Sequence, residues 1–123
     1  YFYRFWLGMS WREDNQEKSD EVRDNLAALK QLTDEQKVDF RVVLLPLMKP
    51  VSEWSKGENW SREQSLSIFK DLNIQVYDLL PTMEKAAAAN EKMVEATGDF
   101  WHPADQMAEQ FARQLDDEKL LIP

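Results

Sequence analysis

The stretch FRVVLL, residues 40–45, decides between two fold classes for this chain. As a helix, it continues a stripe through Val38, Val42 and Leu45, and apolar side chains on several of its sides place it at the centre of a helical bundle. As a strand, its β-branched residues form a short buried run bounded by polar residues. The two alternatives predict an all-α protein and a protein with a sheet.

A capping box three residues before this stretch favours the helix. In TDEQ, residues 33–36, the threonine hydroxyl and the glutamine side chain can satisfy free backbone amides at a helix N-terminus. Pro46 lacks an amide hydrogen and disfavours helical backbone at the residue before it, so the helix kinks or ends there. We therefore expect a helix, and a strand over residues 40–45 is the alternative.

Apolar residues at helical spacing recur along most of the remaining chain. The predicted connector is KPVSEWSKGENW, residues 49–60, and Ser61 opens a second capping box, SREQ. Only 3 Gly and 5 Pro argue against a loop-rich or all-β architecture. The spacing predicts four helices: one through Val22, Leu26 and Leu29, one from the Ser61 cap through the stripe 66–80 and ending by Pro81, one over residues 82–98 ending at Gly98, and one from Pro103 through Met107, Phe111 and Leu115.

These patterns together predict an all-α fold, a bundle of four to five helices with a Trp-containing loop near the middle. With 123 residues, the chain has the length of a single domain. Residues 1–18 form an aromatic N-terminal segment and a polar connector, and residues 19–123 form the helical bundle.

The charge and the cysteine content exclude some classes of function. The net charge of −8 repels phosphate backbones, and no local Lys/Arg stripe offsets it, so nucleic acid is not an expected partner. The chain contains no Cys, which excludes disulfides and thiolate chemistry. The longest apolar run, VVLLPLM, is too short to span a membrane.

The N-terminal stretch YFYRFWLGMSW, residues 1–11, carries six of the 14 aromatic side chains of the protein. Rings at such close spacing fall on two sides of either a helix or a strand. We expect one side to pack on the protein's own core, and the other to contact a protein partner, a second protomer or a membrane surface. The predicted partner-binding residues are these six and two tryptophans of the central loop: Tyr1, Phe2, Tyr3, Phe5, Trp6, Trp11, Trp54 and Trp60.

His102, the only histidine, lies between two carboxylates in DFWHPAD, residues 99–105. A histidine with Asp99 and Asp105 could ligate a metal or serve as an acid–base pair. The same carboxylates also suit the cap and the first turn of the helix that follows, and this is the interpretation we favour. The sequence contains no Gly-rich phosphate loop and no G-x-S-x-G serine motif. We expect no catalytic residue, no metal and no cofactor.

The predicted function is therefore a non-enzymatic interaction module, a subunit, adaptor or regulator that docks through its aromatic N-terminus and Trp-bearing loop. The first residue is Tyr1 and not Met, which leaves a removed signal, transit or anchor segment open and the compartment unassigned.

The motif LTDEQ, residues 32–36, resembles the LTxxQ motif of the periplasmic Spy and CpxP chaperone-like proteins. The resemblance covers five residues and implies an all-helical, exported protein. The alternative function that it implies is a chaperone or sensor that binds apolar ligands or unfolded chains.

Overall fold

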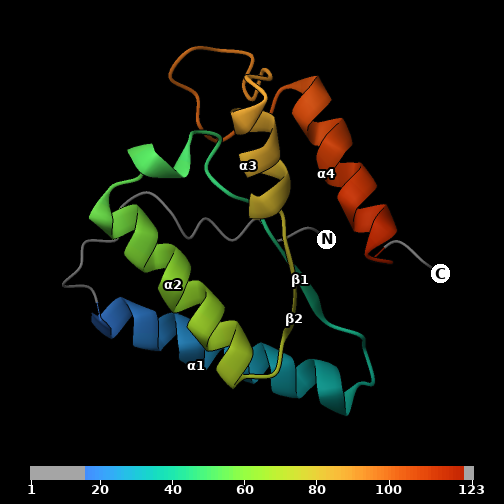
Figure 1. The fold of residues 1–123 in the computed structure, drawn as a ribbon. Helices are drawn as coiled ribbons and strands as arrows, with labels where there is room; N and C mark the ends of the chain where they lie inside the picture. Colours follow the sequence, from blue (N-terminus) through green and yellow to red (C-terminus); the bar gives the residue numbers. More distant parts are fainter. Residues whose placement is uncertain (1–15, 121–123) are drawn as a thin grey trace. The chain divides into compact units, whose positions relative to one another are not determined.

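Residues 16–120 are described by the structure, a computed structural model, and form four α-helices and a two-stranded parallel sheet (Figure 1). The predicted all-α bundle is therefore wrong, because two short strands interrupt the helices. In chain order the elements are α1 (Gln16–Glu35), β1 (Arg41–Leu44), the 3-10 helix η1 (Val51–Glu53), α2 (Lys56–Asp71), β2 (Gln75–Asp78), α3 (Leu80–Ala88) and α4 (Asp105–Asp117).

The motif TDEQ, predicted to be a capping box, lies at the C-terminal end of α1 and not at the N-terminus of a helix. Thr33 lies in the last turn of α1, and its hydroxyl donates back to the carbonyl oxygens of Leu29 and Lys30, at 3.1 and 2.9 Å. Lys37 then adopts a positive φ of 55°, which ends the helix. The β-branched pair Val42 and Val43 follows in extended backbone, so the alternative of a strand is confirmed for Arg41–Leu44. The all-helical fold implied by the LTDEQ resemblance is wrong for the same reason.

The capping box of α2 begins six residues before the predicted one. The Ser55 amide donates to Glu58 Oε2 at 2.7 Å, and the Glu58 amide donates to Ser55 Oγ at 3.2 Å. These reciprocal bonds satisfy amides that a helix N-terminus leaves free. The predicted connector 49–60 is consequently shorter than expected, and Trp60 lies inside α2.

The long helix predicted from Ser61 to residue 80 is right only up to Asp71, because α2 ends there and β2 follows. Asn73, with a φ of 53°, turns the chain between the two elements. Pro81 stands in the first turn of α3, where its missing amide hydrogen is not needed. The proline therefore begins a helix where we expected it to end one.

The helix predicted over residues 82–98 ends ten residues early. Ala88 is the last residue of α3, and Asn90 has a φ of 52°. Gly98 does have the left-handed φ of 84° expected of it, but it lies within a loop and not at a helix end. The predicted stripe of the last helix is confirmed, since Met107 and Phe111 of α4 are 0% and 4% exposed.

The chain divides into two compact units. The first comprises residues 16–41 and 54–75 of the described part, with α1 and α2 side by side. Ser19 of α1 donates to Gln64 of α2, and Arg23 pairs with Asp71 at 2.8 Å. The apolar core of this unit is made by Leu26, Trp54, Ile68, Phe69 and Ile74.

The second unit comprises residues 42–53 and 76–120 of the described part and contains most of the sheet, α3 and α4. Gln114 of α4 ties this unit together, because its Nε2 donates to the Asp78 carbonyl at 2.8 Å while its Oε1 accepts from the Thr82 hydroxyl. The prediction that residues 1–123 form one domain stays a prediction. The apolar core of the second unit is made by Met48, Tyr77, Leu79, Met83, Ala86, Ala104, Met107 and Phe111.

Candidate acid–base site in the loop between α3 and α4

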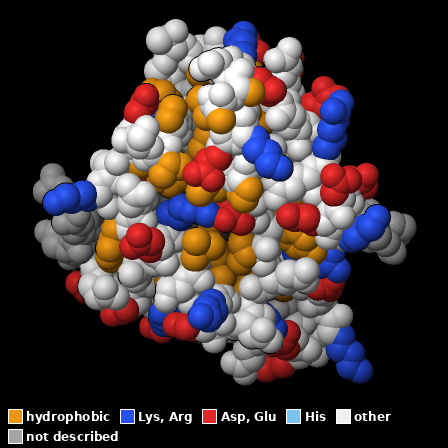
Figure 2. Space-filling view, viewed as in Figure 1, with side chains coloured by type: hydrophobic (Ala, Val, Ile, Leu, Met, Phe, Trp, Pro, Cys, Tyr) orange, Lys and Arg blue, Asp and Glu red, His pale blue; other side chains and the backbone are white. Residues whose placement is uncertain are grey.

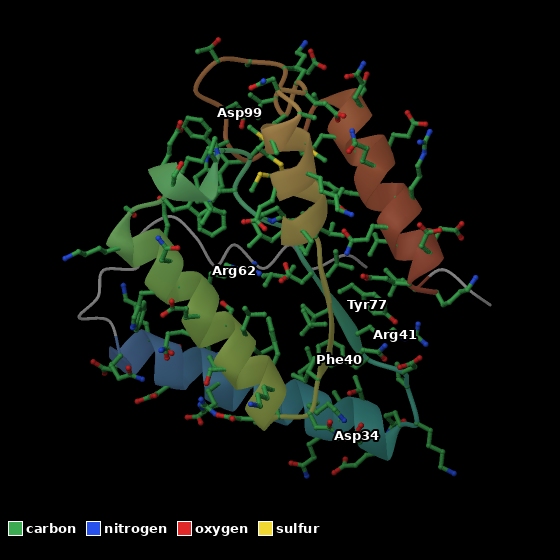
Figure 3. All side chains as sticks on the ribbon, viewed as in Figure 1. Asp34, Phe40, Arg41, Arg62, Tyr77 and Asp99 are labelled. Atoms are coloured by element: carbon green, nitrogen blue, oxygen red, sulfur yellow. The ribbon has the colours of Figure 1, made fainter. Side chains whose placement is uncertain are left out.

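A carboxylate and an imidazole face each other in the loop that joins α3 to α4. Asp99 Oδ2 lies 2.8 Å from His102 Nδ1, and Asp99 is labelled at this loop in Figure 3. The spacing of three residues lets a single turn of chain bring the two side chains together. The His102 side chain is 58% exposed and the Asp99 side chain 30%, so the pair lies at the surface with its carboxylate more deeply seated.

The second oxygen of Asp99 holds the carboxylate in a fixed orientation. Asp99 Oδ1 accepts hydrogen bonds from the backbone amides of Trp101, at 3.0 Å, and His102, at 3.2 Å. The Trp101 amide is the largest cause, followed by the His102 ring, of a pKa of Asp99 below its ordinary value of 3.8. Asp99 is therefore an ionised hydrogen-bond acceptor at neutral pH, which is the form that orients an imidazole.

The loop is tied to its surroundings on both sides of the pair. Val94 and Pro103 form an antiparallel bridge, and the Ala104 amide donates to the Met93 carbonyl at 2.7 Å. The Glu95 carboxylate has a lowered pKa, for which the hydrogen bond from Lys92 is the largest cause and the backbone amide of Asp105 a smaller one. These contacts close the loop at its base, so that residues 99–102 start and finish at defined positions.

The pair lies on the side of the sheet where the strands end. Met48 follows β1 by four residues, and its amide donates to the Phe100 carbonyl at 2.9 Å. The segment that leaves the carboxyl end of β1 therefore holds the residue next to Asp99. In parallel sheets, ligands characteristically bind in the loops beyond the carboxyl ends of the strands.

The hydrogen bond to Asp99 determines what His102 can do chemically. An ionised carboxylate only accepts hydrogen bonds, so His102 Nδ1 carries the shared hydrogen. In the neutral ring, Nε2 then presents a lone pair, and this atom has no hydrogen bond within residues 16–120. A carboxylate-oriented imidazole with an available Nε2 is the arrangement of a general base.

The structure does not join the other predicted ligand to this pair. Asp105 lies in the first turn of α4, where its negative charge suits the helix dipole, although the N-cap is Ala104 and makes no side-chain cap. Within residues 16–120 no group of three or more His, Cys, Asp or Glu side chains is arranged to hold a metal ion. The capping interpretation is half right, because Asp99 does cap the turn at residues 101 and 102.

The predicted partner-binding residues fall into two groups. Trp54 is buried next to the start of α2, and Trp60 is half-buried within it, so neither lies on an exposed loop. None of the described helices is long and apolar enough to cross a membrane. The other six lie outside the described residues: Tyr1, Phe2, Tyr3, Phe5, Trp6 and Trp11.

Sequence reasoning named Asp99 and His102 as a possible acid–base pair and favoured capping over it. The usable signal was the D-x-x-H spacing in a loop, which places the two side chains within reach of each other. Comparison of the chain with protein-family models, with curated proteins and with solved structures found no match.

Proposed function

We propose that the second unit carries the acid–base pair of a hydrolase, with His102 as general base and Asp99 as the group that orients it. The observation that supports this proposal is the 2.8 Å contact between His102 Nδ1 and Asp99 Oδ2, with the opposite ring nitrogen available. The proposal departs from the expected non-enzymatic function, which stays untested. The pair and the loop beyond β1 favour catalysis over simple capping, because a cap does not need the imidazole.

The reaction that fits this pair is hydrolysis of an acyl bond. His102 Nε2 accepts the proton of an attacking hydroxyl, whose oxygen forms a bond to the acyl carbon. When the carbon–oxygen bond to the leaving group breaks, the protonated ring returns that proton to the leaving alkoxide. The Asp99 carboxylate stabilises the positive ring between these two events and does not itself take the proton. The attacking hydroxyl belongs either to a water molecule, which completes hydrolysis in one attack, or to a serine side chain. In the serine case, a water molecule then attacks the acyl-serine ester, giving its proton to His102 Nε2, and the ring returns a proton to the serine oxygen as the acid leaves.

The test compares variants of the pair on a neutral ester such as p-nitrophenyl butyrate. Replacing His102→Gln or Asp99→Asn is expected to lower kcat/KM by about 10²–10⁴-fold, the range for loss of a general base or of its orienting carboxylate. Asp105→Asn is the matched control, because it removes a nearby carboxylate outside the pair. If all three variants hydrolyse the ester like the unaltered protein, the proposed function is wrong.

A fluorophosphonate probe separates the two possible nucleophiles. Such a probe forms a covalent bond with a serine activated by a histidine base, and the adduct mass identifies the modified peptide. Labelling that His102→Gln abolishes supports a serine nucleophile. Hydrolysis that depends on His102 in a protein that stays unlabelled supports attack by water.

A docking function is a second proposal, and exposed apolar side chains in the first unit support it. Leu32 and Val38 are 54% and 56% exposed, and Leu29 is 39% exposed one turn before Leu32. Leu32→Glu should weaken self-association of the protein, measured by sedimentation velocity, while its circular dichroism spectrum stays unchanged. A protein that is monomeric and captures no unfolded chains, with or without this substitution, would contradict both docking and the chaperone-like alternative.

A further inference from the structure

The sheet is small for a parallel one. Within residues 16–120, β1 and β2 pair with each other, and each is four residues long. Sheets typically have about four to six strands, and parallel sheets are covered on both faces. Val42, Val43 and Leu44 are only half-buried, and Figure 2 shows hydrophobic side chains that reach the viewed face among Asp, Glu, Lys and Arg. The described strands therefore have the form of an incomplete parallel sheet.

A hydrogen bond of Leu44 shows which edge of β1 a further strand would occupy. The Leu79 amide donates to the Leu44 carbonyl at 3.1 Å, so the backbone of Leu44 points toward β2. Backbone groups alternate in direction along a strand, so the amide and the carbonyl of Val43 point to the opposite edge. A strand that bonds to Val43 would lie on the side of β1 away from β2.

The helix α2 shows how this chain connects two parallel strands. Residues 45–55 lead from β1 to α2, and residues 72–74 lead from α2 to β2. Parallel strands require such a crossover, because a tight turn cannot join them. Crossovers of this kind are right-handed in nearly all proteins.

The helix α1 has the same relation to β1 that α2 has to β2. The two helices lie side by side and run in the same direction (Figure 1), because Ser19 contacts Gln64 and, further along both helices, Arg23 contacts Asp71. Residues 36–40 then lead from α1 to β1. The helix α1 is thus placed as the crossover helix of a second unit, whose first strand comes before residue 16.

The handedness of the crossovers places that first strand. Two right-handed crossovers whose helices lie side by side advance across the sheet in the same direction. The step from β1 through α2 leads to β2, so the step through α1 must start on the other side of β1. This is the edge toward which the backbone of Val43 points.

The sequence before α1 has the composition of a strand in a parallel sheet. Residues 1–6, YFYRFW, lie outside the described residues, and five of the six are aromatic. Aromatic residues are enriched in strands, and a parallel strand is apolar at successive positions because both faces of its sheet are covered. Residues 7–15 then separate this segment from α1, a connection comparable to residues 45–55 between β1 and α2.

We propose that residues 1–6 form a third parallel strand on the edge of β1 away from β2, so that the sheet order is residues 1–6, β1, β2. The occupant of this edge is the chain's own N-terminal segment. Its aromatic rings then cover the protein's own sheet, and they are not primarily a docking surface for another protein. The proposal is independent of the hydrolytic function proposed for Asp99 and His102.

Disulfide cross-linking tests the pairing, and the chain suits it because it contains no Cys. Val43→Cys is combined in turn with a single cysteine at each of residues 2–6. Neighbouring strands lie about 4.8 Å apart, within the Cα separation that a disulfide spans. We expect every second position to form the disulfide, because successive side chains point to opposite faces. The oxidised protein should remain a monomer on a non-reducing gel.

A second pair of variants tests the direction and the order of the strands. The bond between Leu79 and Leu44 sets a register in which Arg41 lies beside Gln75. With Arg41→Cys in place of Val43→Cys, the cross-linked position should move two residues toward the N-terminus, as parallel pairing requires. Gln75→Cys is the matched control, because it lies one strand further away, at about 9–10 Å, and should form no disulfide. A shift toward the C-terminus, or cross-linking to Gln75→Cys instead, would overturn the proposal.

The remaining outcomes separate the chain's own segment from other occupants. Disulfide-linked dimers in place of the monomer would show that a second copy supplies the strand. The absence of any disulfide to β1, in variants that keep the circular dichroism spectrum of the unaltered protein, would mean that residues 1–6 do not pair there. Either result overturns the proposal.

Hydrogen exchange in the unaltered protein decides the question if the cysteine variants do not fold. The Val43 amide points away from β2, so only a further strand on that edge pairs it within the sheet. We expect its exchange to be at least about 100-fold slower than in an unstructured chain. Exchange of the Val43 amide as fast as in an unstructured chain would show that the edge is open, and would overturn the proposal.

Discussion

Replacing Gly98→Ala isolates the backbone strain that the acid–base loop requires. Gly98 has a φ of 84°, and it immediately precedes Asp99. A Cβ atom built at this position meets no heavy atom within 4 Å. The substitution therefore adds a conformational cost without adding a clash, and this makes its effect simple to calculate.

The magnitude follows from two opposing terms. Left-handed backbone costs a residue with a Cβ roughly 1–2 kcal/mol. Alanine also restricts the unfolded chain, which returns about 0.4–1 kcal/mol to the folded state. The difference of the two ranges is an expected net loss of about 0–1.6 kcal/mol, with a central value of about 0.8 kcal/mol. Four residues other than glycine have a positive φ in the described chain, and their values lie between 52° and 66°: Lys37, Asn73, Asn90 and Lys119. The φ of 84° at Gly98 is outside this range.

The strain is local, so the assay must detect local opening of the loop. The amides of Trp101 and His102 donate to Asp99 Oδ1, and hydrogen exchange measures how often these bonds open. The central loss of about 0.8 kcal/mol corresponds to exchange about four times faster in Gly98→Ala. Urea unfolding should show a loss of equal size if the loop opens only together with the rest of its unit.

Gly98→Asn provides the matched comparison, because asparagine tolerates left-handed backbone better than alanine does. Its exchange rates should fall between those of the unaltered protein and those of Gly98→Ala. Identical exchange in all three proteins would refute the reasoning, since it would mean that the loop holds the pair without a left-handed residue at position 98.

Two further predictions concern the core of the second unit and the ionisation of the pair. Phe111→Ala, at a side chain only 4% exposed, should cost about 3–5 kcal/mol in urea unfolding, whereas Arg113→Ala on the exposed side of α4 should cost less than about 0.5 kcal/mol. A cost for Phe111→Ala near that of the control would show that this side chain is not in the core. The pKa of Asp99 is lowered from 3.8 on folding, so its ionised form stabilises the folded state above pH 3.8 and this contribution is lost as the pH falls through the lower folded value. The Tm of the unaltered protein should therefore exceed that of Asp99→Asn above pH 3.8, and the difference should shrink as the pH falls below it. A difference that persists in strong acid would contradict this assignment.

The parts of the fold that sequence predicted best are those where a single local signal acts alone. The stripe through Met107 and Phe111 has regular helical spacing, and α4 follows it. Gly98 was expected to have a left-handed φ because glycine enters that region without penalty, and it does. These features depend on neighbouring residues and need no knowledge of distant contacts.

The errors arose where one short motif has two opposite meanings. TDEQ contains the residues of a capping box, but the same threonine hydroxyl can bond back to carbonyl oxygens in the last turn of a helix. Pro81 is equally suited to follow a helix or to begin one. In both cases the choice depends on whether the flanking apolar residues pair as strands, and that pairing joins residues more than 30 positions apart. The local spacing of apolar residues therefore gives no information about this strand pairing.

The misassigned stretch 40–45 also explains why the sequence did not connect the candidate acid–base pair to the rest of the fold. If these residues were helical, Met48 would belong to a bundle, and nothing would link it to the loop 99–102. As a strand, β1 pairs with β2 and its end leads directly to Met48, whose amide holds Phe100. This hydrogen bond anchors the loop that contains the D-x-x-H motif beyond the carboxyl end of a parallel strand. Ligands characteristically bind at that end of a parallel sheet. The capping interpretation came from the positions of Asp99 and Asp105 beside a helix start, and it remains correct for Asp99, which accepts from the amides of Trp101 and His102. The contact from Met48 was the part that local sequence could not supply, because it depends on β1 being a strand.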